Sequence, residues 1–164
     1  MTLQHAITNW QGKSAADISD IYQRYQHSDN FVQNLLQCMQ QSALQKGATW
    51  LLKCHLESHG TVPANAVYKR LSQLQHWQSK LHILQCIPYL PIGSSDKHGL
   101  EVFLRQCLTD NNKFVRAWAY NGFHLLACQY GEYREETEQF LRMAMRDEAP
   151  SVQARVRNIL KQGF

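Results

Sequence analysis

The sequence predicts an all-helical protein built from consecutive helical hairpins. Apolar residues recur at helical spacing along nearly the whole chain, whereas strict alternation of apolar and polar residues is scarce. No hairpin signal lies between β-branched runs, so no sheet is expected. The third observation is a segment near the C-terminus that repeats at a spacing of 37 residues.

The composition is that of an ordered domain. Hydrophobic residues make up 44% of the 164 residues and charged residues 18%, so the chain can bury a continuous core, and we expect one domain over residues 1–164. No stretch approaches about 18 consecutive apolar residues, and the five cysteines include no Cys-x-x-Cys pair. These features predict a cytoplasmic protein with free thiols and no membrane attachment. The net charge of +4 permits a nucleic-acid partner but does not argue for one.

Helix starts and stops divide the chain into segments. Helices are expected at about 14–27, 29–39, 44–60, 63–74, 76–87, 96–108, 111–131, 133–146 and 150–164. Capping residues are expected at Ser14, Asp29, Asp96, and Asn111 or Asn112. Gly131 is expected to close its helix in the left-handed conformation. Residues 88–96 hold two prolines, a glycine and two serines, and are therefore expected to form a loop and a hinge.

Residues 104–123 repeat as residues 141–160, with six identities in twenty positions where about one is expected by chance. The identical pairs are Leu104 and Leu141, Arg105 and Arg142, Asp110 and Asp147, Val115 and Val152, Ala117 and Ala154, and Asn121 and Asn158. In the second copy we expect Val152, Val156 and Leu160 to point into the core. The repeat unit is a helix, a turn and a second helix.

The turn and second helix of the first copy resemble a HEAT repeat. Asp110 stands in the turn, and Val115 with Arg116 opens the second helix, as the Asp and the Val-Arg pair do in that family. The second copy keeps the Asp and the Val but has Gln153 in place of the arginine. We expect Asp110 to accept backbone N–H bonds and Arg116 to bridge to a carboxylate of the next repeat. The resemblance is clearest over residues 97–162 and implies a right-handed α-α superhelix of about four helical pairs plus an N-terminal helix.

Second helices line the concave surface of HEAT-like arrays, so the resemblance implies a binding face on the side of these helices away from the core. The candidate residues on it are Arg116, Tyr120, Asn121, His124, Gln153, Arg157, Asn158 and Lys161. Lys53 and Lys80 from earlier repeats are expected to continue it. This mixture of side chains suits recognition of a protein segment, and a solvated helix face is the alternative for each residue. Trp118, beside this face, is expected to pack between repeats, and stacking on a ligand is the alternative.

These features together predict a non-catalytic scaffold or adaptor whose partner is a protein. The alternative is nucleic-acid binding along the same face, motivated by Arg116, Arg155, Arg157 and Lys161 and by similarity to HEAT-like alkylated-base DNA glycosylases. That family uses more repeats, and its catalytic set cannot be placed on this sequence. A third interpretation is a HEAT-like lyase or chaperone-like subunit that acts with a second chain. The sequence does not define the partner or the oligomeric state.

No constellation of residues predicts an enzyme, a cofactor or a metal site. His55 and His59 stand four apart on one helix near Cys54 and Glu57, but the glutamate of the zinc-protease helix and a third ligand are missing. The sequence has no Gly-rich phosphate loop and no Gly-x-Ser-x-Gly elbow, and no cysteine has neighbours that would activate it. The acidic residues within 132–138 are expected to be solubilising surface.

Overall fold

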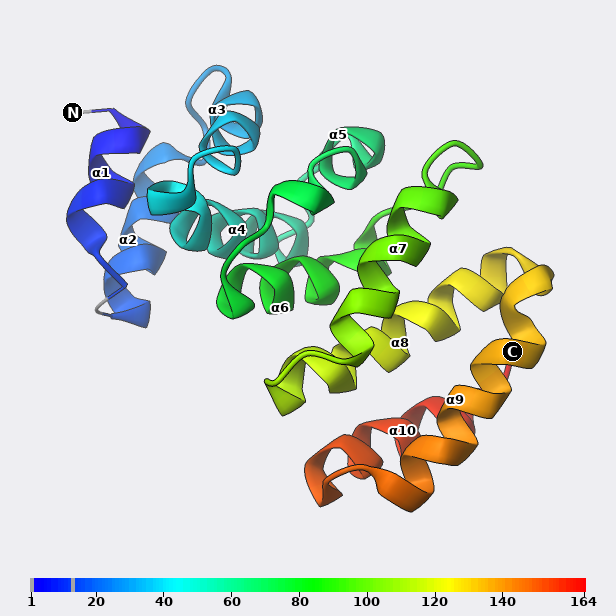
Figure 1. The fold of residues 1–164 in the computed structure, drawn as a ribbon. Helices are drawn as coiled ribbons and strands as arrows, with labels where there is room; N and C mark the ends of the chain where they lie inside the picture. The colour runs from blue at the N-terminus through cyan, green and yellow to red at the C-terminus, as the bar shows by residue number, and fades with distance from the viewer. Residues whose placement is uncertain (1, 13) are drawn as a thin grey trace. The chain divides into compact units, whose positions relative to one another are not determined.

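The computed structural model describes residues 2–12 and 14–164 and shows an all-helical fold, as the sequence predicts (Figure 1). The described residues form ten α-helices, three short 3₁₀-helices and no β-strand. Within these residues no helix is both long enough and apolar enough to cross a membrane. The chain divides into two compact units, Met1–Leu90 and Pro91–Phe164, and the boundary falls inside residues 88–96. The superhelix, the hinge and the single domain stay predictions.

The first unit begins with a helix that the sequence analysis does not predict. Its helices are α1 (Leu3–Trp10), α2 (Ala15–Tyr25), α3 (Phe31–Cys38), α4 (Ser42–Glu57), α5 (Ala64–Tyr68) and α6 (Trp77–Cys86), with 3₁₀-helices at Leu71–Gln73 and Ile87–Tyr89. Thr2 caps α1 by accepting a hydrogen bond from the His5 N–H at 3.2 Å. The buried residues of α1 are Leu3, Ala6, Ile7 and Trp10. Their spacing is helical, but the polar residues between them hide the apolar pattern in the sequence. The chain therefore begins with two helices that pack together, α1 and α2, where a single N-terminal helix is predicted.

The predicted helix starts are partly right. Ser14 caps α2 as expected, because its Oγ accepts the Asp17 N–H at 3.3 Å. Asp29 does not cap α3: the N-cap is Asn30, whose backbone is left-handed at φ 64° and whose side chain makes no capping bond. Asp96 stands at the N-cap of α7, also without a side-chain bond. The sequence therefore predicts where these helices begin better than it predicts which side chains form the capping hydrogen bonds.

Helix α4 is the central helix of the first unit and packs against α1, α2, α3 and α6 (Figure 1). Gly47 allows α1 to approach closely, since a Cβ there would lie 2.6 Å from the Cγ2 of Ile7. The buried Gln45 side chain donates to the Gln73 carbonyl and accepts the Gln75 N–H, both at 2.7 Å. These bonds fix the chain after α5, which is shorter than the predicted helix at 63–74.

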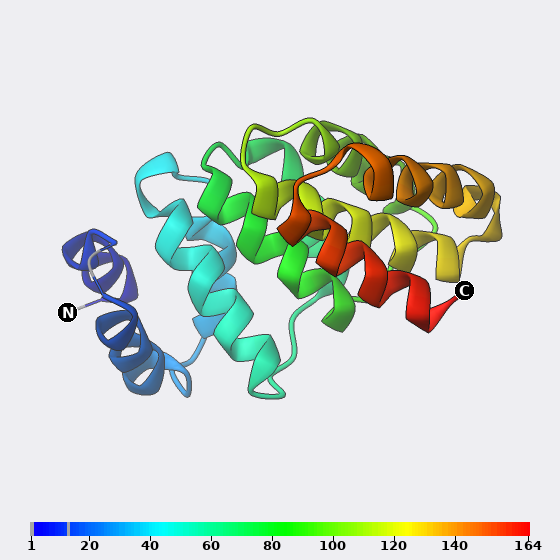
Figure 2. The ribbon, with the colours of Figure 1, turned by 90° about the horizontal axis from the view of Figure 1, so that it is seen from below.

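The second unit is built around α8. Its elements are α7 (Lys97–Leu108), α8 (Lys113–Gln129), a 3₁₀-helix (Gly131–Tyr133), α9 (Arg134–Asp147) and α10 (Pro150–Gln162). Helix α8 packs against α7, α9 and α10, and Figure 2 shows α8 and α10 side by side. The left-handed helix end predicted at Gly131 is wrong, because neither Gly131 nor its neighbours have a positive φ. Tyr130 instead leaves the helix in an extended conformation, and its hydroxyl donates to the Ile92 carbonyl at 2.8 Å.

The two copies of the 37-residue repeat form the hairpins α7–α8 and α9–α10. Both members of three aligned pairs are buried: Leu104 and Leu141, Val115 and Val152, and Ala119 and Val156. The inward orientation predicted for Leu160 is wrong, because this side chain is 52% exposed. Its equivalent Phe123 is buried, with its ring centre 5.1 Å from that of Phe140 on α9. No helix in the described part of the chain follows α10 to cover Leu160 in the same way.

Candidate binding surface on α8 and α10

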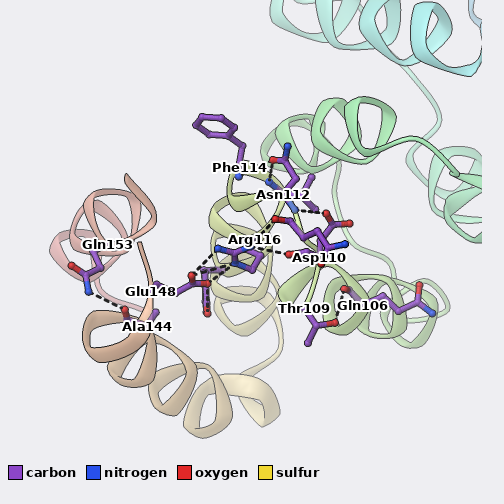
Figure 3. Close-up of polar contacts among 12 residues, drawn as sticks. Gln106, Thr109, Asp110, Asn112, Phe114, Arg116, Ala144, Glu148 and Gln153 are labelled. Atoms are coloured by element: carbon purple, nitrogen blue, oxygen red, sulfur yellow. Dashed lines mark hydrogen bonds and ion pairs between the residues drawn. The ribbon is translucent and has the colours of Figure 1, made fainter. Parts of the chain in front are cut away.

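The start of α8 is held by two side chains of the preceding turn. The Asp110 carboxylate accepts the Asn112 N–H at 2.8 Å. The Asn112 side chain then accepts the N–H groups of Phe114 at 2.9 Å and Val115 at 3.3 Å, as a helix N-cap does (Figure 3). The expectation that Asp110 accepts a backbone N–H is confirmed.

Arg116 links the two hairpins. Its Nε donates to Glu148, in the turn before α10, at 3.0 Å, and its Nη1 donates to the Asp110 carbonyl at 2.9 Å (Figure 3). The hydrogen bond to Glu148 raises the pKa of Arg116. The bridge predicted for this arginine is confirmed, and its guanidinium is therefore engaged within the second unit.

Three further candidate residues are also engaged inside the second unit. Tyr120 is buried and donates its hydroxyl to Glu148 at 3.2 Å; burial, and next the charge of Glu148, raise its pKa to about 12. His124 is buried, and its Nε2 donates to the Gly163 carbonyl at 2.6 Å. Gln153 donates to the Met145 carbonyl at 3.0 Å. Because α10 covers this side of α8, Tyr120 and His124 join the two hairpins instead of facing solvent, whereas Gln153 joins α9 and α10 within one hairpin.

The remaining candidates are accessible. Arg157, Asn158 and Lys161 are exposed and Asn121 is half-buried. Arg157 and Lys161 stand 37 residues after Tyr120 and His124, so they occupy the side of α10 that corresponds to the covered side of α8. The candidate set is thus split between two faces. Lys53 and Lys80 lie on α4 and α6 of the first unit, and Lys53 pairs with Glu57 at 3.6 Å.

A different stripe of α8 faces outward. Its residues follow one another at spacings of four, three and four, which places them on one side of a helix: Phe114, Trp118, Asn121 and Leu125. The equivalent stripe of α10 is Ser151, Arg155, Asn158 and Gln162. We name these eight residues the outward strip. Phe114 is 49% exposed, and Figure 3 shows its ring pointing away from the Arg116–Glu148 pair.

Trp118 and Arg155 connect the two halves of the outward strip. The guanidinium carbon of Arg155 lies 4.2 Å from the centre of the Trp118 ring, within the range of a cation–π contact. Trp118 thus packs between the repeats, as expected, while both side chains stay half-buried. Phe114 and Leu125 are not among the surface residues expected from the sequence. The helical spacing that starts at Phe114 could have identified this stripe. The apolar character of Phe114, taken alone, assigns it to the core instead.

The charges of the second unit are segregated. Helices α8 and α10 contain no Asp or Glu, and their basic residues are Lys113, Arg116, Arg155, Arg157 and Lys161. The acidic residues lie on α7, on α9 and in the turns, as in the pairs Arg105–Glu136 at 2.6 Å and Arg134–Glu138 at 3.3 Å. The acidic segment 132–138 is therefore surface that is partly ion-paired. Among the described residues only Arg116 of the five cations has a carboxylate partner within 4.0 Å.

The histidines and cysteines considered for chemistry are engaged or unactivated. His55 Nδ1 lies 3.2 Å from the Tyr22 hydroxyl, and burial lowers the pKa of His55. No group of three or more His, Cys, Asp or Glu side chains within residues 2–12 and 14–164 could hold a metal ion. Burial raises the pKa of the thiols of Cys38, Cys54, Cys86 and Cys128 above the ordinary value. These thiols ionise less readily than a free cysteine.

Comparison of the chain with family models, with curated proteins and with solved structures gives no match.

Proposed function

We propose that this protein is a cytoplasmic, non-catalytic scaffold of the HEAT-like α-solenoid type, and that its second unit binds a segment of a partner protein on the outward strip. The repeated hairpins α7–α8 and α9–α10 support the architecture, since stacked hairpins present their second helices as neighbours. The stripe of α8 with exposed Phe114 and half-buried Trp118, Asn121 and Leu125 supports the binding role.

The observation that carries the proposal is the exposure of Phe114 on the same stripe as Trp118 and Leu125. Large apolar side chains that share one face mark interaction surfaces more often than single exposed ones do. Aromatic and arginine side chains dominate the energetics of protein interfaces, and the amides of Asn121 and Asn158 lie on the same strip to bond a peptide backbone. The strip therefore combines anchors with polar contacts.

Selection from a displayed library of random peptides, followed by titration of the enriched peptides, tests this function. We expect enriched peptides to bind the unchanged protein and to lose about tenfold or more in affinity with Phe114→Ala or Trp118→Ala, because truncation at an interface anchor costs about 2 kcal/mol. Met143→Ala is the matched control, since Met143 is 51% exposed and lies on α9, which contributes no residue to the strip. Peptides that respond equally to all three variants would count against the strip.

Nucleic-acid binding is the second candidate, and the absence of acids from α8 and α10 favours it. Two observations argue against a continuous basic track. Glu148 neutralises the charge of Arg116, and the helical positions of Arg157 and Lys161 place them on another side of α10 from Arg155. Titration of labelled duplex and single-stranded oligonucleotides at two salt concentrations decides the matter. Affinity that is absent, or that does not change with salt, excludes this function.

A further inference from the structure

We propose that the Trp118–Arg155 pair is a carboxylate-binding element, so that the outward strip selects partner segments in which an acidic residue stands two positions from a large apolar residue. This inference rests on the proposed function, because it names the chemistry of the segment that the strip binds.

The position of Arg155 is the first support. Its guanidinium lies on the Trp118 ring at 4.2 Å, and no carboxylate among the described residues lies within 4.0 Å of it. A guanidinium that stacks on a ring keeps its in-plane N–H groups available, and their fork geometry matches a carboxylate. Stacking also restricts the side chain before a partner arrives, which lowers the entropy lost on binding.

The second support is the charge of the surrounding surface. Neither α8 nor α10 contributes an acid, and Glu148 is already occupied by Arg116 and Tyr120. No carboxylate of these two helices therefore competes with a carboxylate of another molecule for Arg155. Lys113, near the start of α8, adds positive charge without a carboxylate partner in the described structure.

The third support is the apolar content of the strip, which favours a peptide over a polyanion. Arg155 is its one basic residue, and it shares the strip with Phe114, Trp118 and Leu125. A strand of nucleic acid carries a phosphate at every nucleotide and is held by a series of cations. A peptide with one acid and a large apolar side chain matches the strip better.

The spacing within α8 defines the motif. Phe114 precedes Trp118 by four residues, which is about 6 Å along a helix axis. Two residues of an extended peptide cover about 6.6 Å. An acid bound at Trp118–Arg155 therefore places the side chain two positions away over Phe114.

The experiment uses the peptide selection of the proposed function and reads its sequence pattern. We expect Asp or Glu to be enriched two positions from Phe, Leu, Trp or Met. For synthetic peptides, Glu→Gln at that position should weaken binding to the unchanged protein about tenfold, as for a lost charge-assisted hydrogen bond. Arg155→Gln should remove this difference, whereas Arg142→Gln, at an exposed arginine on α9, should leave it unchanged.

A charge exchange keeps the test independent of any effect of Arg155→Gln on folding. Arg155→Glu should bind the peptide with Lys in place of the acid more tightly than the acidic peptide, with both proteins checked for equal helical circular dichroism. If the peptides depend on Phe114 and Trp118 but show no acidic preference, the carboxylate inference is wrong and the proposed function stands. If no peptide depends on Phe114 or Trp118, the proposed function itself is wrong, and the inference with it.

Discussion

His82 is the buried ionisable side chain that should give the first unit its pH dependence. It lies on α6 with its Nδ1 2.9 Å from the Thr49 hydroxyl oxygen and its ring centre 5.3 Å from that of Trp50. Burial, and to a smaller extent the charges of Lys53 and Lys46, lower its pKa from 6.5 to about 4. The neutral imidazole is thus the form that fits the core.

We expect the free energy of unfolding to fall as the pH drops from 6.5 to about 4. The pKa of His82 is lower in the folded state, so the unfolded chain takes up the proton first; the contribution is complete above pH 6.5 and is lost towards pH 4. Its size is at most about 3 kcal/mol. Urea unfolding followed by tryptophan fluorescence at a series of pH values measures it. His82→Gln should be less stable at pH 7 but show a shallower pH dependence, and an unchanged slope would rule out His82 as the cause.

Arg116 and Glu148 form the ion pair most shielded from solvent in the second unit, with side-chain exposures of 22% and 13%. We expect Arg116→Met and Glu148→Gln each to lower the free energy of unfolding by about 1–3 kcal/mol. In the double variant the loss should be smaller than the sum of the two, because the partners lose the same interaction. Urea unfolding of the four proteins gives the coupling.

The Arg105–Glu136 pair is the matched control, because both side chains are 40% exposed. The same substitutions at this pair should cost less than about 1 kcal/mol, as surface ion pairs do. Equal costs at the two pairs would show that the bridge from Arg116 has no special part in joining the hairpins.

At the scale of helices, the close approach of α1 and α4 decides the sign of a substitution at Gly47. Alanine should favour the helix by about 1 kcal/mol, but its Cβ would meet the Ile7 Cγ2 at 2.6 Å. Overpacking of this kind costs about 1–3 kcal/mol. The clash therefore outweighs the gain in helix propensity.

We expect Gly47→Ala to lower the melting temperature and Gly99→Ala to raise it. Gly99 lies inside α7, and a Cβ there would meet no atom within 4 Å, so only the gain in propensity remains. Combining Gly47→Ala with Ile7→Ala, which removes the opposing Cγ2, should cost less than the sum of the single changes. Melting followed by circular dichroism tests both substitutions. A stabilising Gly47→Ala would mean that α1 moves away from α4 without cost.

The sequence predicts those features of the helices that depend on nearby residues, and it does not predict those that depend on the packing of distant helices. The repeat places Val115 and Val152 in the core, and Asp110 and Arg116 in their structural roles, because these follow from local spacing and turn chemistry. The predicted binding face is partly wrong because the burial of side chains on α8 depends on where α10 packs. The helical spacing within α8 gives no information about the position of α10. A helix covered by three neighbours leaves only a narrow exposed stripe, so Tyr120 becomes buried.

At the scale of the whole molecule, each of the two units has buried residues of its own. In the second unit, one cluster joins α8, α9 and α10 through Tyr120, Leu141, Val152 and Val156. In the first unit, Leu51 and Leu52 of α4 are fully buried. The sequence predicts one domain with a hinge at 88–96. The spacing of apolar residues does not decide whether the two units unfold together or one at a time.

We expect a cavity in one unit to loosen mainly that unit. Leu141→Ala should cost about 2–5 kcal/mol, as buried leucine truncations do, and hydrogen exchange should accelerate across α7 to α10 while the amides of α4 keep their protection. Leu52→Ala, on α4, should produce the reverse pattern. Exchange measured by mass spectrometry on the full chain resolves the two, because local opening follows the contacts that each helix shares. Equal acceleration in both units after either substitution would show one cooperative fold, and the hinge would then have no thermodynamic basis.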